Sequence, residues 1–391
     1  MNSNEHDNQQ KQRGENVFRF LLQNVLRTGS IECESSKFRS FLLFLVLFIT
    51  ATSLPAEQIV GGVINRNTRW NAEDGPYRLI KDLVIARNYR LTISPGTRVI
   101  IETVPGIDTM ITQTNRIDSS TIAIKVHGSL ICIGRFDKRI TFLPTTENRS
   151  SPLWYGIELI EADEQFTEIA YTDIANAYIG VTVENCSPLV RNSILEFNHI
   201  GLSCINFGSV RFFNNIIANN TAAGIRVTRS NPTILNNIIY NNHNTGIWCD
   251  GASKLTFEYN CVFGNRDQDF LECNPEYCIN AKKNKNGDSV DIFKNICADP
   301  IFSGSPADSA ARIADLNIPT DPEKIKNHTI ASIVQSVHDS VKTKYPKKYR
   351  YTLSPYSPCR DAGNPSRKFN DRDETKNDMG IFGGPKFIDN N

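Results

Sequence analysis

A sequence repeat of about 22 residues constrains the fold of this chain more than any other feature. It runs from Tyr155 to Asn265. Each unit holds an apolar strand opened by Gly, a small polar turn, a second apolar strand, an Asn-containing turn, a third short strand and another Asn. The opening glycines, spaced by 24, 21, 23 and 22 residues, are Gly156, Gly180, Gly201, Gly224 and Gly246. Because one unit cannot bury its own apolar face, the units must stack into a solenoid with a continuous core.

Apolar and polar residues alternate within each unit, as residues 225–228 (IRVT) and 247–250 (IWCD) show. A period of two is the pattern of a strand. A helical repeat would need apolar spacing near 3.6, and a leucine-rich repeat would need Leu at fixed positions. We therefore predict a solenoid of strands.

Asparagine recurs at two positions of the repeat. In a stacked turn, Asn satisfies backbone groups, adopts the left-handed backbone region and pairs with the Asn above and below. We interpret these residues as structural ladders and not as catalytic groups; they are Asn215, Asn237 and Asn260, and Asn220 and Asn242. The apolar residues that follow the first ladder position are aligned as Ile174, Ile194, Ile216, Ile238 and Cys261.

Four further segments extend the pattern: Pro76–Glu102, Ile122–Pro144, Trp154–Ile160 and Ser357–Pro385. With the repeat, they make most of residues 60–390 resemble the right-handed parallel β-helix proteins of the pectin-lyase-like fold, in particular the secreted NosD-like and disaggregatase-related type. The resemblance implies an all-β solenoid, which we expect to have about ten coils. It leaves the function open, because this fold carries lyases, hydrolases, isomerases, adhesins and binding proteins.

The sequence predicts five regions. They are a disordered tail (1–40), a signal peptide or signal anchor (41–56), the right-handed parallel β-helix (57–302), an insertion with one amphipathic helix (303–350) and a closing segment of the β-helix (351–391). The helix is predicted from Ile330, Val334, Val337 and Val341, which follow a capping Thr320 at helical spacing.

Residues 41–54 (FLLFLVLFITATSL) are the longest apolar run, preceded by Lys37 and Arg39. This run is short for a membrane span, which needs about 20 residues, and fits the apolar part of a secretory signal. We expect a secreted or cell-surface protein, which would be membrane-anchored through residues 41–54 if they are not cleaved. An over-long N-terminus from an early start codon and a buried core helix are the alternatives.

The charge balance bears on the class of partner, and the positions of the cysteines indicate core or disulfide roles. The chain has 43 basic and 42 acidic residues, which argues against a nucleic-acid binder. Cys132, Cys204 and Cys249 fall on core positions of the repeat. The candidates for disulfides in the less regular C-terminal part are Cys273, Cys278, Cys297 and Cys359. The spacing of Cys273 and Cys278, with no His cluster, does not favour zinc.

The resemblance implies that the Gly-led strands face the groove in which the family's enzymes bind polysaccharides. Two outward columns follow in this chain. The first is Glu158, Thr182, Ser203, Arg226 and Trp248, and the second is Ile160, Glu184, Ile205, Thr228 and Asp250. An exposed Trp can stack on a sugar ring while charged groups bind its hydroxyls. The candidate glycan-binding residues are therefore Glu158, Glu184, Arg226, Trp248 and Asp250, the alternative being an ordinary solvated strand face.

No catalytic set is assigned from the sequence. Two carboxylates of a glycosidase lie about 5–9.5 Å apart, a separation that Glu158 and Glu184 on neighbouring coils could meet. The paired Asp residues of polygalacturonase-like sites and the calcium-binding Asp set of pectate-lyase-like sites are absent. Three hypotheses stay open: an exported protein that binds or processes a carbohydrate, a polysaccharide lyase or glycoside hydrolase, and a non-catalytic surface scaffold or NosD-like accessory protein. The chain has only six His, and they form no pattern that would support a copper site for a NosD-like protein.

One oxygen-rich stretch near the C-terminus is a calcium candidate through Asp371, Asp373 and Asp378. It lacks the central Gly and closing Glu of a calcium loop, so a structural turn is the favoured interpretation. No other cofactor is expected.

Overall fold

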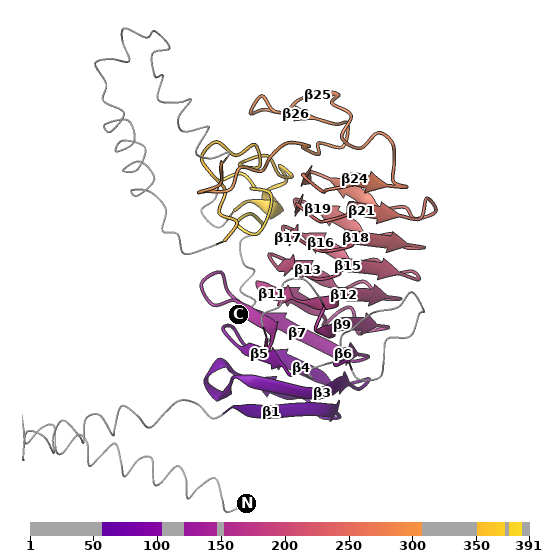
Figure 1. Cartoon of the computed structure of the whole chain (residues 1–391), viewed down its shortest axis with the longest axis vertical. Coiled ribbons are helices and arrows are strands. Elements are labelled where there is room, and N and C mark those ends of the chain that lie inside the picture. The colour runs from indigo at the N-terminus through magenta and orange to yellow at the C-terminus, as the bar shows by residue number, and fades with distance from the viewer. Residues whose placement is uncertain (1–56, 104–120, 147–151, 307–349, 372–374, 385–391) are drawn as a thin grey trace, which may run out of the picture. The chain divides into compact units, whose positions relative to one another are not determined.

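A computed structural model describes residues 57–103, 121–146, 152–306, 350–371 and 375–384 (Figure 1). The chain divides into two units, Met1–Leu54 and Pro55–Asn391, and all described residues belong to the second. The predicted tail, the apolar segment at 41–54 and the predicted amphipathic helix lie outside the described residues. Within the described ranges, none of the helices has the length and apolar character to span a membrane.

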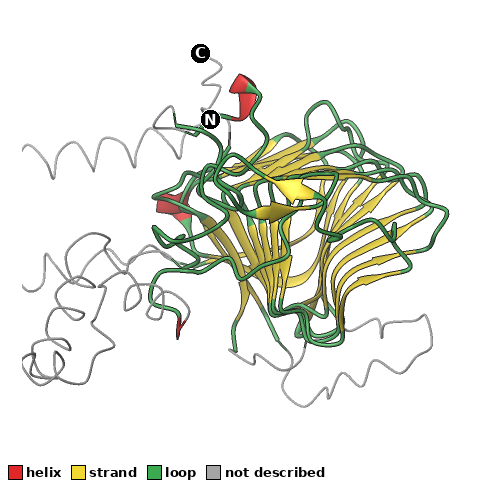
Figure 2. Ribbon diagram, turned by 90° about the horizontal axis from the view of Figure 1, so that it is seen from above, coloured by secondary structure: helices red, strands yellow, loops and turns green. Residues whose placement is uncertain are grey.

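Strands of successive coils stack in parallel and form three walls around the core (Figure 2). We call these walls the first, second and third sheets; the first and third belong to one continuous 16-stranded sheet. The first sheet holds β6 (Ala123–Val126), β9 (Trp154–Ile160), β12 (Ala177–Glu184), β15 (Ile200–Ile205), β18 (Ala223–Thr228), β21 (Thr245–Cys249) and β24 (Gln268–Leu271). The second holds β2 (Thr68–Trp70), β4 (Arg90–Ile93), β7 (Ser129–Ile133), β10 (Glu168–Ala170), β13 (Leu189–Arg191), β16 (Arg211–Phe213), β19 (Thr233–Leu235) and β22 (Thr256–Glu258). The third holds β5 (Arg98–Ile101), β8 (Ile140–Pro144), β11 (Thr172–Ala175), β14 (Ile194–Glu196), β17 (Ile216–Ala218), β20 (Ile238–Tyr240) and β23 (Cys261–Phe263).

The first and third sheets share the long strand β3 (Tyr77–Ile85). Its first half pairs with β5 and its second half with β6, while β1 (Gln58–Ile64) pairs with β3 from the other side. The second sheet has eight strands, one for each turn of the solenoid. The predicted all-β parallel solenoid is therefore confirmed, but it has about eight turns and not ten. Beyond β24 the described residues are less regular, and a single parallel bridge from Cys261 to Ile296 continues the stacking.

The inward side chains form one core along the solenoid. In the first sheet, Val181, Leu202, Ile225 and Ile247 stack in register and are fully buried. Burying one such side chain contributes about 1.5–3 kcal/mol, and the repeat adds one in every coil. The three cysteines predicted on core positions, Cys132, Cys204 and Cys249, are also buried.

The opening glycines are explained by close stacking of the coils. A Cβ on Gly201 would lie 2.6 Å from the carbonyl oxygen of Gly224, and one on Gly224 would lie 2.7 Å from that of Gly246. Contacts this short leave no room for a side chain. The column of Gly residues therefore allows the first-sheet strands of successive coils to pack this closely.

Two buried ladders of Asn side chains join the coils. In the first, the backbone N–H groups of Asn215 and Asn237 donate to the side-chain oxygens of Asn237 and Asn260. In the second, the backbone N–H groups of Asn220 and Asn242 donate to the side-chain oxygens of Asn242 and Asn265.

Both ladders end on a carboxylate. Asn295 continues the first ladder and its N–H donates to Asp291, while the second ladder ends where Asn265 donates to Asp269. The last Asn of each ladder has N–H groups but no Asn of a further coil to accept them. A carboxylate, which only accepts hydrogen bonds, satisfies these donors.

The alignment of Ile174 with Ile194 is wrong by one residue. Asp173 pairs with Ile194, and Ile174 pairs with Leu195 on the core side. The next residues of the column, Ile216 and Ile238, face outward with Ile194. Ser193 stands at the ladder position in this coil and Thr172 in the coil before it, so the Asn spacing gives no marker there.

The C-terminal residues 350–371 and 375–384 cover this outward apolar column. Leu353, Cys359, Met379 and Ile381 pack on the outward residues of β14, β17, β20 and β23 (Ile194, Ile216, Ile238 and Cys261). A short 3-10 helix, Arg367–Phe369, lies in the first of these ranges. The closing segment therefore lies on the flank of the solenoid, because that is where the apolar surface needs cover.

A separate segment after β24 covers the last coil. Tyr277 packs against Phe257 and Phe270 of the final strands, and a disulfide joins Cys278 to Cys297. The segment includes the hairpin of β25 (Lys282–Lys283) and β26 (Ser289–Val290). We call residues 273–297 the end cap, since they continue the core and the first Asn ladder at the C-terminal end.

Candidate functional site

The predicted first column lies in register on the first sheet. Strand pairing places Glu158 beside Thr182, Thr182 beside Ser203, Ser203 beside Arg226 and Arg226 beside Trp248. We call these five residues the first-sheet strip. Their neighbours along each strand are buried in the core, so the strip is on the outer face.

Arg226 and Trp248 form one unit at the C-terminal end of the strip. The guanidinium carbon of Arg226 lies 4.9 Å from the centre of the Trp248 ring, and the indole is 37% exposed. The Nε atom of Arg226 is buried and has no hydrogen-bond partner in the described ranges. Stacking by the cation fixes the plane of the indole and leaves part of its surface open to a ligand.

Glu158 lies at the other end of the strip in a mostly buried setting. Burial raises the pKa of the Glu158 carboxyl, and the charges of Asp82 and Glu184 add to the shift, while Lys125 opposes it. Tyr155 lies close by, and burial with the charge of Glu158 raises its pKa to about 12. This end of the strip therefore combines a carboxyl with raised proton affinity and a phenol that stays protonated.

The middle of the strip differs from the solvated face expected there. Thr182 and Ser203 are only 4% and 2% exposed, although they alternate with core residues and face outward. Both side chains are covered by surrounding atoms, and the Thr182 hydroxyl has no hydrogen-bond partner within the described residues. The accessible chemistry is therefore concentrated at the two ends, Glu158 and the Arg226–Trp248 pair.

The structure shows other roles for the two candidates of the second column. Glu184 stays in register with Ile160 and Ile205, and its carboxylate accepts a hydrogen bond of 2.7 Å from Asn206. Asp250 follows β21, and its carboxylate accepts from the backbone N–H groups of Arg229, Ala252 and Ser253. The first carboxylate borders the strip, whereas the second holds a turn together.

An aromatic row beside the strip was missed by the sequence reasoning. The rings of Tyr155 and Tyr178 are 6.0 Å apart, and Tyr178 stacks on His199 at 4.9 Å. His199 is mostly buried, which lowers its pKa, and a ring nitrogen lies 3.1 Å from the Thr221 hydroxyl. The signal was present in the sequence, because Tyr155 and Tyr178 stand just before β-strand glycines one repeat apart.

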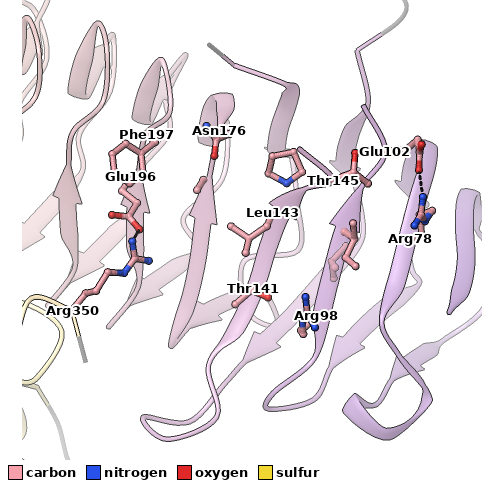
Figure 3. Close-up of a pocket in the computed structure, with 14 residues that line it drawn as sticks. Arg78, Arg98, Glu102, Thr141, Leu143, Thr145, Asn176, Glu196, Phe197 and Arg350 are labelled. Atoms are coloured by element: carbon pink, nitrogen blue, oxygen red, sulfur yellow. Dashed lines mark hydrogen bonds and ion pairs between the residues drawn. The ribbon is translucent and has the colours of Figure 1, made fainter. Parts of the chain in front are cut away.

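A pocket of about 610 Å³ lies on the outer face of the third sheet (Figure 3). Its charged lining residues are Arg78, Arg98, Glu102, Glu196 and Arg350. We call it the arginine pocket. The sequence reasoning missed it, because the strands that line it precede the regular repeat or lie far from Arg350 in the chain.

Residues 146–292 match the family model described as Right handed beta helix region. This part of the chain is a right-handed β-helix region. The match runs from the segment before β9 into the end cap, and the same parallel stacking continues through the earlier coils to β1. No curated protein matches the chain. The right-handed β-helix fold is thus established, while the NosD-like subtype stays an expectation.

The calcium candidates of the β-helix lie in its closing segment. The Asp371 carboxylate accepts the backbone N–H groups of Asp378 and Gly384, and Asp378 accepts that of Asp361. Asp373 lies outside the described residues. Within those residues, no three His, Cys, Asp or Glu side chains are grouped as metal ligands. These contacts support the turn interpretation.

Proposed function

We propose that this protein binds an extended glycan along the first-sheet strip. The observation that carries the proposal is the exposed Trp248 ring, held by Arg226, in one column with Glu158. The ring offers an apolar platform for the less polar face of a sugar. The Arg226 guanidinium and the Glu158 carboxyl supply a donor and an acceptor for hydroxyl groups.

The spacing of these groups favours a chain of several sugars over a single sugar. Glu158 and Arg226 are three coils apart, and coils stack at about 4.8 Å, so the two ends are separated by about 14 Å. Thr182 and Ser203 between them are almost fully buried, so the ligand would bridge the two accessible ends. An oligosaccharide lying parallel to the solenoid axis would contact both ends at once.

Two single variants of the full chain test this proposal. The native chain is first screened for retention by a panel of plant, algal and microbial polysaccharides. Trp248→Ala is then compared with Tyr89→Ala, whose ring is also 37% exposed but lies in a turn outside the strip. We expect Trp248→Ala to weaken binding at least about tenfold, as loss of an aromatic platform does, and Tyr89→Ala to leave it unchanged. Equal binding by both variants, or no retention of any polymer by the native chain, would refute the proposal.

Catalysis by the strip is the second candidate function, and the raised pKa of Glu158 is the observation that favours it. A carboxyl whose pKa is raised by burial is suited to the role of general acid in a glycosidase. The test is release of reducing ends or unsaturated uronates from the retained polymer, with calcium and with a chelator. A Glu158→Gln variant that binds the polymer but releases no product would support an enzyme, and absence of release by the native chain would leave a binding protein.

The proposal includes export, because a polysaccharide ligand is met at the cell surface or outside the cell. Its support is the apolar run at residues 41–54. N-terminal sequencing of the protein recovered from the medium and from the membrane fraction would distinguish a cleaved signal from an anchor.

A further inference from the structure

The outer face of the third sheet changes character along the solenoid. One column of paired residues runs Arg98, Thr141, Asp173, Ile194, Ile216 and Ile238. The apolar half of this column is covered by the closing segment, and the polar half lies beside the arginine pocket. The pocket is therefore a polar part of the same face, next to the end of the cover.

Ion pairs inside the pocket leave one arginine free. Arg78 pairs with Glu102 at 2.7 Å and with Glu57, outside the lining, at 2.9 Å, and Arg350 pairs with Glu196 at 2.5 Å. Arg98 is exposed, and its guanidinium makes no ion pair with any described residue. The lining thus has three Arg against two Glu, a formal balance of +1 if both Glu are ionised.

We propose that the arginine pocket binds a small hydroxylated carboxylate. A guanidinium fork matches the two oxygens of a carboxylate, and Arg98 presents one that no protein group occupies. The Thr141 hydroxyl, paired in register with Arg98, makes no hydrogen bond to another described residue and can bind a ligand hydroxyl. Leu143 and Pro144 add an apolar wall for the carbon skeleton.

The same residues disfavour a ligand with two negative charges. Glu102 and Glu196 also line the pocket, and each is already matched by one arginine. A dianion such as phosphate would meet one free positive charge and two carboxylates nearby, so part of its charge would be opposed. A monocarboxylate matches the single guanidinium, that of Arg98, which makes no ion pair with a described residue.

The test is calorimetric titration of the full chain at pH 7.5 with D-glucuronate, D-glucose and inorganic phosphate. The first two probes differ in a carboxylate, and phosphate supplies an oxyanion of higher charge. We expect glucuronate to bind at least tenfold more tightly than either other probe. No heat from glucuronate at millimolar concentration, or equal affinity for glucose, would overturn the proposal, and tighter binding of phosphate would overturn the carboxylate assignment.

Substitutions of single arginines test where glucuronate binds. Arg98→Gln should weaken glucuronate binding at least tenfold, whereas Arg211→Gln, at an exposed arginine that opens β16 of the second sheet, should leave it unchanged. Arg98→Lys keeps the positive charge but lacks the two-pronged guanidinium. Its glucuronate affinity should lie between that of Arg98→Gln and that of the native chain. Native glucuronate affinity in Arg98→Gln would refute the assignment of the arginine pocket as the binding site. Arg98 lies outside the first-sheet strip, so failure of the Arg98 prediction and failure of polysaccharide binding by the strip are separate results.

Discussion

Asn237 makes more ladder contacts than its small side chain suggests. Its side-chain oxygen accepts from the backbone N–H of Asn215, and its amide donates to the carbonyls of Phe212 and Leu235. All these groups are buried, and each group left without a partner costs about 1–3 kcal/mol. We predict that Asn237→Ala lowers the free energy of unfolding by about 3 kcal/mol, measured by urea denaturation.

An exposed asparagine of the same repeat is the control. Asn241 has a φ of 53° and donates to Asn219 at the surface. Asn241→Gly keeps this backbone conformation available, and loss of one exposed hydrogen bond should cost less than about 1 kcal/mol. Equal destabilisation by the two variants would show that the buried ladder has no special part in stability.

Glu196 provides a second test at the residue scale. Burial raises the pKa of its carboxyl and the charge of Asp173 adds to this, while Arg350 and the Tyr351 hydroxyl oppose it. The folded state therefore holds the proton more tightly than the unfolded state. The resulting stabilisation is complete below the ordinary Glu pKa and is lost as pH rises through the folded-state value.

The Glu196→Gln variant removes this titration. We predict that its melting temperature, relative to that of the native chain, rises between pH 4 and pH 7. Glu276→Gln, at an exposed position of the end cap, should show no such trend. A difference for Glu196→Gln that is constant over this pH range would contradict the assigned direction of the shift.

At the scale of elements, the sequence predicted features that repeat along the chain. The Gly column, the inward apolar residues and the buried Asn positions all recur at fixed spacing because each coil meets the same neighbours. The first-sheet strip was predictable for the same reason. The alignment error at Ile174 occurred where Thr172 and Ser193 replace the Asn marker.

Features that depend on contacts between distant segments could not be read from the spacing. The closing segment reaches β14, β17 and β20 from more than 100 residues away in the sequence, and Arg350 completes the arginine pocket in the same way. The burial of Thr182 and Ser203 was also hidden, because alternation indicates which face a side chain is on and not how much its neighbours cover it.

Docking of the closing segment gives a prediction at this scale. The Asn214 amide donates to the carbonyl of Asp378 and to the Asn377 side chain, at 2.9 and 3.0 Å. Asn214→Gly removes these bonds and keeps the positive φ of 55° accessible. We predict faster tryptic cleavage at Lys376, by roughly the five- to thirtyfold that 1–2 kcal/mol of lost docking implies.

The matched control is Asn185→Gly, at a turn with a φ of 49° on a different corner of the coils. It should leave cleavage at Lys376 unchanged. An Asn214→Gly chain that resists trypsin as well as the native chain would mean that the apolar contacts alone hold the closing segment in place.

For the molecule as a whole, stability is spread along the solenoid. Each coil contacts mainly its two neighbours, so total stability is close to a sum of coil and interface contributions, and the ends open most readily. The end cap opposes opening at the C-terminal end. There the Cys278–Cys297 disulfide closes a loop with a sequence separation of 19, which contributes about 3 kcal/mol by restricting the unfolded chain.

Because each coil depends mainly on its neighbours, removal of the end-cap disulfide should destabilise only the coils next to the cap. In the Cys278→Ser/Cys297→Ser variant, backbone amides of β21 and β24 should exchange with solvent about tenfold or more faster, because they lie next to the weakened cap. Amides of β9 and β12, several coils away, should keep their native rates. Hydrogen exchange read by mass spectrometry separates the two cases. Uniform loss of protection along all coils would show that the solenoid opens as one cooperative unit, and the first-sheet strip would then depend on the end cap for its shape.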